Sequence, residues 1–312
     1  MVESNHKKIS KFLKSDRVTY KGLEKENLRS DLDGKISNKS FPKSFGVHNF
    51  NRYITLDYSE PHLELVTPPF VKNFDAYNFL CDLHKYVEEN LDGDLLWNYS
   101  MPPKFKSKYI KLPPHRESNT TKLAHLYRLG LRNRYGDKMQ STAGIHFNFS
   151  FSDSVIKALG NNKTEIYLGV SRNFLRLFPI ILRLIGCSPV THKSFLKGRQ
   201  INIENLDEED CYLPKSTSLR VSRLGYYSEE QDESLITFNS LDEYLLTLKD
   251  YINSPNDKFK NISLDLKQQV NNGTIQMESE LYNHVRPKGI ISNDVRAYTP
   301  LKNIGIEYLE MR

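Results

Sequence analysis

The segment Gly144–Ser152 alternates between apolar and polar side chains, and this alternation is the feature that most limits the fold. Successive side chains of an extended strand point to opposite faces. The strand therefore has one apolar and one polar face: Ile145, Phe147, Phe149 and Phe151 against His146, Asn148 and Ser150. Such a strand is typical of an antiparallel sheet with a dry back and an open polar front.

Further segments have the alternation of strands or the spacing of helices. The predicted strands are Gly22–Arg29, Tyr53–Tyr58, Leu63–Val66, Ile275–Tyr282 and Gly305–Arg312. The predicted helices are Asp75–Leu91, Glu165–Gly186 and Leu241–Ile252, the last with Ser240 as its N-cap. Together they predict an α+β fold in which helices flank an antiparallel sheet.

Composition narrows the class of protein. The chain has 312 residues, 38% of them hydrophobic, which is enough for a sizeable core. Three cysteines without a CxxC pair indicate neither a disulfide framework nor a zinc site, so we expect a cytoplasmic protein. The apolar run Phe174–Val190 is interrupted by Arg176, Pro179 and Arg183, which favours an amphipathic helix over a membrane span. The net charge of +6 suits an anionic ligand.

Acidic residues recur at alternate positions of the predicted strands. They are Glu24, Glu26, Asp57, Glu64, Glu278, Glu280 and Glu310. Any one of them is more often a solvated strand residue than a ligand. Seven on the polar faces of strands that share one core predict a carboxylate-lined cavity, and repulsion within it indicates bound Mg²⁺ or Mn²⁺. His146 on the polar face is a further candidate ligand, although a lone histidine is usually structural.

Arginines close to these acids suggest a chemistry. Arg128, Arg220 and Arg312 lie beside the acidic or aromatic segments. A guanidinium matches phosphate and carboxylate oxygens, and divalent cations with arginines on one sheet face are typical of phosphoryl transfer. The sequence has no GxxxxGK[ST] and no GxGxxG motif, which excludes a P-loop and a Rossmann fingerprint.

The order of short motifs resembles the glutamate–cysteine ligase family of the gammaproteobacterial type. The resemblance runs from about Gly22 to Arg312 through GLEKENLR (22–29), DYSE (57–60), LELVTPP (63–69), Trp97 with SMP (100–102), YR (127–128), NRYG (133–136), MQ (139–140), GIHFNFS (144–150), SLR (218–220), LGY (224–226), ELY (280–282), RPK (286–288) and GIEYLEMR (305–312). It implies a curved antiparallel sheet related to glutamine synthetase.

The resemblance also implies roles for individual residues. Those that match the family's metal ligands are Glu24, Glu26, Asp57, Glu64, His146 and Glu310. Arg312 matches an ATP-phosphate contact, and Arg128 is a second candidate. The residues that match the cysteine pocket are Tyr58, Tyr127, Arg220, Tyr226 and Tyr282. Tyr58 stands where phenylalanine is usual and Arg223 where an acid is usual, which puts the polarity of the pocket in question.

The activity implied by the resemblance is the ATP-dependent joining of the L-glutamate γ-carboxylate to the amine of L-cysteine through γ-glutamyl phosphate. This reaction is the first step of glutathione biosynthesis. The expected partners are small-molecule substrates, without nucleic acid or membrane, and a monomer is expected. Residues 1–21 are expected to form a basic helix or arm, and residues 22–312 the catalytic domain.

Length is the main departure from the family. Family members continue past the strand that matches Gly305–Arg312 through a largely helical region. The domain is therefore expected to be incomplete, with Arg312 on a frayed end and little or no ligase activity. The first alternative is a non-catalytic remnant that binds only divalent cations or nucleotide.

Two further alternatives differ in the ligand. A ligase acting on another amine is possible because the sequence specifies the amine pocket less firmly than the metal site. A nucleic-acid-binding protein could use the ten Lys/Arg between Lys104 and Lys138, but the segment lacks the evenly spaced aromatic residues of a stacking platform.

Overall fold

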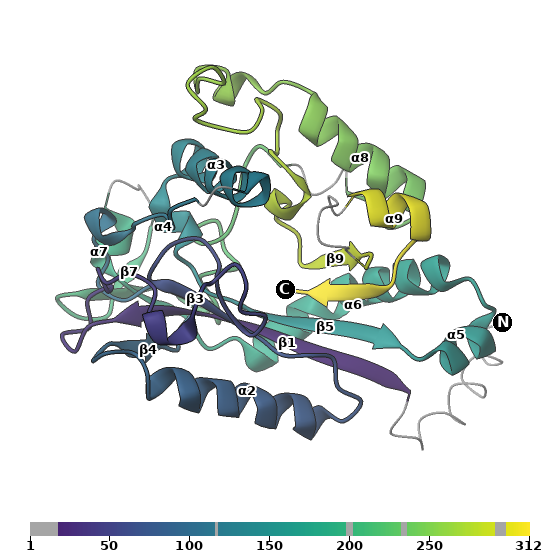
Figure 1. Ribbon diagram of the computed structural model, residues 1–312, viewed down its shortest axis with the longest axis horizontal. Helices are drawn as coiled ribbons and strands as arrows, with labels where there is room; N and C mark the ends of the chain where they lie inside the picture. The colour runs from purple at the N-terminus through teal and green to yellow at the C-terminus, as the bar shows by residue number, and fades with distance from the viewer. Residues whose placement is uncertain (1–17, 116–117, 198–201, 232–235, 291–297) are drawn as a thin grey trace.

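The computed structural model describes residues 18–115, 118–197, 202–231, 236–290 and 298–312. Its main sheet has the order β2-β3-β1-β5-β10-β9, and β4 also pairs with β1 (Figure 1). The strands are β1 (Thr19–Ser30), β2 (Ile54–Leu56), β3 (His62–Val66), β4 (Leu95–Trp97), β5 (Ile145–Phe151), β9 (Val285–Lys288) and β10 (Tyr308–Met311). All its pairings are antiparallel, which confirms the predicted sheet.

A three-stranded sheet and the helices complete the described fold. The small sheet contains β6 (Val190–His192), β7 (Glu204–Asn205) and β8 (Asp210–Tyr212). The helices are α2 (Asn73–Glu88), α3 (Asn119–Tyr135), α4 (Asp137–Gln140), α5 (Asp153–Leu159), α6 (Lys163–Ile185), α7 (Lys193–Leu196), α8 (Leu241–Asn253) and α9 (Tyr298–Ile304). Among the described residues no helix is long and apolar enough to cross a membrane.

The three predicted helices are confirmed, and their ends follow local chemistry. The Ser240 side chain accepts a hydrogen bond from the backbone N–H of Glu243, which makes it the N-cap of α8 as predicted. The Asn162 side chain caps α6 in the same way. On α6, Tyr167 and Leu168 are buried in a core shared with α8 and β10.

The face of the sheet that is enclosed near His146 is not the face that the sequence predicted to be buried. Figure 1 shows α2 against one face and α3 over the opposite face. On β5 the polar side is the enclosed one, because His146 is 2% exposed, whereas Ile145 is 59% and Phe147 36% exposed. The prediction of a dry back and an open polar front is therefore wrong for this half of the strand. Alternation identified the two faces but not which of them another element covers.

Two predicted segment assignments are also wrong. Residues 275–282 do not form a strand, and Glu278–Glu280 instead form a 3-10 helix. Glu278, Glu280 and Tyr282 therefore do not share the polar face of a strand. At the other end of the chain, β1 begins at Thr19, so residues 19–21 belong to the sheet rather than to a basic arm. The rest of that predicted arm, residues 1–17, lies outside the described residues.

Candidate active site

One cavity of about 200 Å³ brings together the predicted metal ligands and the predicted phosphate-binding arginines. It lies between the sheet and α3, and its charged lining consists of Glu24, Glu26, Asp57, Glu64, Arg128, His146, Arg286, Lys288, Glu310 and Arg312. The side chains come from segments almost 290 residues apart in the chain. The sequence-based set therefore converges in space, while the role of each member stays a prediction.

Strand register explains this convergence. Glu26 of β1 pairs with Glu64 of β3, and Glu24 of β1 pairs with His146 of β5. Paired residues of an antiparallel ladder project from the same face. On the far side of β5, Glu310 pairs with Asn148, which brings the last acid to the same row.

His146 lies at the centre of the acidic cluster. Its Nδ1 is 3.1 Å from Glu24 Oε2 and 3.9 Å from Glu310 Oε1, and its Nε2 is 3.4 Å from Glu26 Oε1. Burial alone would raise the pKa of Glu26, but the charges of His146 and Arg220 outweigh it and lower that pKa to about 2. Glu26 also accepts the backbone N–H of Gly144 at 2.6 Å.

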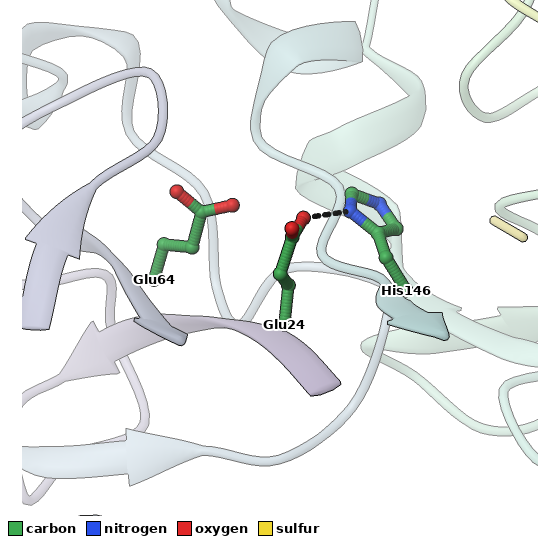
Figure 2. A group of neighbouring side chains, drawn as sticks. All are labelled: Glu24, Glu64 and His146. Carbon is green, nitrogen blue, oxygen red and sulfur yellow. Dashed lines mark hydrogen bonds and ion pairs between the residues drawn. The ribbon is translucent and has the colours of Figure 1, made fainter. Parts of the chain in front are cut away.

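Glu64 is the carboxylate that the protein leaves unbalanced. Figure 2 shows it beside Glu24 and His146, with a dashed contact only between the latter two. Burial first, and then repulsion from Asp57, Glu24 and Glu26, raises the pKa of Glu64 well above its ordinary value. Within the described part of the chain no hydrogen bond or ion pair to its carboxylate is found. Glu64 is thus the acid at which neighbouring positive charge fails to offset burial and repulsion.

The donor set fits a divalent cation. One ligand atom from each of Glu24, Glu64 and His146 lies within 4.8 Å of the others. In addition, His146 Nε2 is buried and makes no hydrogen bond to any described residue. Carboxylate oxygens with one imidazole suit Mg²⁺ or Mn²⁺, and such an ion would relieve the repulsion at Glu64.

Arg312 is held in place, contrary to the expectation of a frayed end. Its backbone N–H donates to the carbonyl of His284 at 2.9 Å, and its guanidinium pairs with Glu310. Its side chain is 10% exposed. Lys288 and Arg286 also face Glu310, and these charges outweigh burial and hold the pKa of Glu310 well below its ordinary value. Glu310 is therefore ionised and positions a guanidinium at the cavity.

Arg128 reaches the same cavity from α3. Its Nε donates to the carbonyl of Asp57 at 2.9 Å and its Nη2 to the carbonyl of Leu56 at 3.1 Å. These bonds fix the guanidinium over the end of β2, next to the Asp57 side chain. Two of its donors are thus committed to the backbone.

The predicted cysteine-pocket residues divide into two groups. Arg220, Tyr226 and Tyr282 line a small adjoining cavity of about 40 Å³ together with His284 and Arg312. The rings of Tyr226 and Tyr282 pack edge to face with their centroids 4.2 Å apart. The Cζ atom of Arg220 lies 5.2 Å from the centroid of the Tyr226 ring.

The other two pocket residues, Tyr58 and Tyr127, line the main cavity, and Tyr226 lines both cavities. The Tyr58 hydroxyl donates to Asp137 at 2.7 Å, and Asp137 is also held by Arg132. The hydroxyl that distinguishes Tyr58 from phenylalanine is thus bound to Asp137.

Glu278 and Glu280 do not line the cavity. Glu280 is fully buried, and its carboxylate accepts hydrogen bonds from Arg134, Tyr135 and Gln276. Including it in the acidic constellation is therefore wrong, because a neighbouring arginine already balances its charge. Arg134 belongs to the basic segment 104–138, so this part of the supposed nucleic-acid surface faces the core.

Sequence reasoning missed Lys288, Arg286, Gln140 and His284 as lining residues. The first three lie inside quoted motifs, so an assignment of roles within those motifs could have found them. A further cavity of about 430 Å³ continues from Glu24 and is lined in part by Tyr20, Pro69 and Tyr308.

The fold and the site define a mixed α+β protein whose antiparallel sheet carries a cluster of carboxylates flanked by arginines. Residues 5–312 match the family described as glutamate-cysteine ligase, and the chain belongs to this family. The predicted fold class and the resemblance are thereby confirmed.

Similar proteins agree with this assignment. The chain is 40% identical to the glutamate–cysteine ligase of Wigglesworthia glossinidia brevipalpis over 97% of its length and 62% of the relative's. It is 37% identical to that of Buchnera aphidicola subsp. Baizongia pistaciae, covering all of this chain and 64% of the relative. The solved ligase of Francisella tularensis, in complex with AMP, superposes with a TM-score of 0.87 at 30% identity, over 95% of this chain and 61% of that one. The chain thus spans about three-fifths of its relatives' length.

Proposed function

We propose that the protein joins the γ-carboxylate of L-glutamate to the amine of L-cysteine at the expense of ATP. The observation that carries the proposal is the convergence of Glu24, Glu64, His146 and Glu310 with Arg312 in one cavity of a glutamate–cysteine ligase family member. The Francisella relative was solved with AMP, which supports a nucleotide as ligand.

The reaction has two steps. An oxygen of the γ-carboxylate attacks the γ-phosphorus of ATP, the bond to the bridging oxygen breaks, and ADP leaves. The cysteine amine then attacks the acyl phosphate carbon, phosphate leaves, and the amine loses a proton. Bound Mg²⁺ or Mn²⁺, held by the carboxylates and His146, would neutralise charge on the transferring phosphoryl group.

The chain's own residues bind and orient the reactants. Arg312, aimed by Glu310, places a fixed positive charge where the phosphoryl group develops negative charge. Arg128 is fixed by β2 carbonyls and adds a second guanidinium. The cavity that continues from Glu24 past Tyr20 and Tyr308 has the volume and rings to accept an adenosine. No side-chain nucleophile is needed.

The small cavity beside Arg220 is the proposed place for the amino-acid end of cysteine. A guanidinium in a cavity that Tyr226 and Tyr282 also line suits a carboxylate. Arg220→Ala should therefore raise the KM for cysteine far more than the KM for ATP. Equal increases for both substrates would assign Arg220 to the phosphate instead.

The direct test is to measure γ-glutamylcysteine formation from ATP, glutamate, cysteine and Mg²⁺. The chain should be compared with a version joined to the C-terminal region of the Wigglesworthia ligase, and Arg312→Ala serves as the inactive control in both. Product formation that depends on Arg312 in either version supports the proposal. ATP and metal binding without product in both versions would favour the non-catalytic alternative, and product with another amine would favour a different amine substrate.

A further inference from the structure

Lys25 stands between the two acids of the GLEKENLR motif but projects from the other face of β1. It shares that face with Asn27. Its Nζ donates to Asn27 Oδ1 at 3.0 Å and to Asn98 Oδ1 at 2.8 Å, and it lies 3.0 Å from Nε2 of His84 on α2. None of these four residues lines the main cavity or the small adjoining one. The cluster is therefore separate from the candidate active site.

Lys25 has neutral neighbours, although a lysine taken out of water usually pairs with an acid. It is half-buried, and across the two ladders of β1 it pairs with Leu65 and Ile145, so neither adjacent strand places a carboxylate beside it. Within the described part of the chain no carboxylate forms an ion pair with its amine, and Glu88 of α2 acts on it only from a longer distance. The ammonium form thus has no opposite charge in contact.

The contacts of Lys25 suit a neutral amine as well as an ammonium. His84 Nε2 accepts from the ammonium in one tautomer and donates to the lone pair of the neutral amine in the other. Burial lowers the pKa of Lys25 to about 8, against the opposing effect of Glu88. Burial and then the Lys25 charge lower the pKa of His84 to about 4, so the imidazole is neutral near pH 7. The amine is also accessible, because its bond to Asn98 lies on the solvent-exposed side.

We propose that Lys25 is a nucleophilic amine that becomes acylated, with small acyl phosphates as the acyl donors. The neutral Nζ attacks the acyl carbon and a C–N bond forms. The bond from that carbon to the phosphate oxygen breaks, phosphate leaves with the electron pair, and the nitrogen loses one proton to water. Desolvation of this kind activates lysine amines as nucleophiles. The product is an amide, so the side chain loses its positive charge.

Acetylation rates of individual lysines in the unaltered chain test this proposal. The full chain is incubated with acetyl phosphate at pH 8, and peptide mass spectrometry follows each lysine with time. Lys35 is the internal control, because Asp33 contacts its amine at 2.7 Å and raises its pKa. At pH 8 about half of the Lys25 amine is neutral, against less than about 1% of an ordinary lysine. Because a less basic amine is a weaker nucleophile, we expect Lys25 to react about 10-fold faster than Lys35.

A single change of charge beside the amine sharpens the test. Asn98→Asp replaces the amide whose oxygen lies 2.8 Å from Lys25 Nζ by a carboxylate, so the pKa of the lysine should rise. Acetylation of Lys25 should then slow to the rate of Lys35. The matched control is Asn205→Asp, which adds the same charge at an exposed residue of β7 and should leave the Lys25 rate unchanged. Melting curves check that both variants are folded.

Equal rates at Lys25 and Lys35 in the unaltered chain would overturn the proposal, as would an unchanged Lys25 rate in folded Asn98→Asp. A parallel reaction with a small acetyl thioester distinguishes the donors, and faster labelling of Lys25 by the thioester alone would exclude acyl phosphates as the donor class. The result is independent of the proposed ligase activity, because the acetylation rates are measured without ATP, glutamate or cysteine.

Discussion

The buried carboxylate of Glu280 and the acids around His146 have different surroundings. Glu280 lies 3.1 Å from Arg134 and also accepts hydrogen bonds from Tyr135 and Gln276, so both of its oxygen atoms have donors, although burial still raises its pKa. The acids around His146 instead face one another, and the pKa of Glu64 is raised by burial and by three neighbouring carboxylates.

A structural acid differs from a candidate ligand in its partners and not in its sequence pattern. Both kinds follow the same alternating pattern in the sequence, as Glu278 and Glu280 mimic Glu24 and Glu26. The two kinds of acid differ in the charged groups that surround each carboxylate. An acid that finds a buried guanidinium stabilises the fold, whereas acids that share a face without enough positive charge form a site for a cation.

The largest loss of stability is expected when Glu280 loses its partner Arg134. Arg134→Met leaves Glu280 buried without its guanidinium, so it should lower the free energy of unfolding by about 3–5 kcal/mol. Urea denaturation measures the loss, and added Mg²⁺ should not restore it. Lys260→Ala, which breaks an exposed pair with Asp257, should change stability by about 0–1 kcal/mol. If both variants lose similar amounts, the pair with Glu280 is not structural.

Substitution of Glu64 should raise the stability of the metal-free protein instead of lowering it. Glu64→Gln removes a repelled charge, so the metal-free protein should melt higher, by roughly 2–4 °C for each kcal/mol of repulsion relieved. The same change should abolish most of the thermal stabilisation by Mg²⁺ or Mn²⁺, which for the unaltered chain is about 2.7 kcal/mol at 100 times Kd. A lower metal-free melting temperature with unchanged metal stabilisation would mean that Glu64 is neither repelled by its neighbours nor a cation ligand.

The dependence of stability on pH should show both signs in one metal-free protein. The folded-state pKa of Glu64 is above the ordinary 4.5, so folding takes up a proton there and stability should rise as pH falls from neutrality toward 4.5. The folded-state pKa of Glu26 is about 2, so stability should fall as pH drops from 4.5 toward 2. Melting temperature against pH measures both, and in Glu64→Gln the rise should be smaller but not absent, because burial also raises the pKa of Asp57 and that of Glu280.

The smallest effect is expected at Tyr58. Tyr58→Phe removes the hydrogen bond to Asp137, but Arg132 still holds that carboxylate at 2.8 Å, so the loss should be about 0.5–1.5 kcal/mol. Metal stabilisation should not change, because the hydroxyl is committed to Asp137. Calorimetry with and without Mg²⁺ measures both values. A large change in metal stabilisation would mean that the hydroxyl serves the cavity.

Much of the site followed from the sequence because its residues lie on regular strands. Period-two alternation places Glu24 with Glu26 and Tyr308 with Glu310 on common faces, whatever the strands pack against. Family motifs then selected the acids that line the cavity. The alternating pattern of residues 275–282 predicted a strand wrongly. This segment pairs with no strand in the described part of the chain, and Glu278–Glu280 form a 3-10 helix.

Elements with local causes can be predicted from the sequence, as for the helix that Ser240 caps. Which acids have a positive partner depends on how distant segments pack together. Arg134 and Glu280 are 146 positions apart, and Glu24 and His146, which lie 3.1 Å apart, are separated by 122 positions. Charge balance in a buried site depends on every group within a few ångströms, and long-range packing selects those groups.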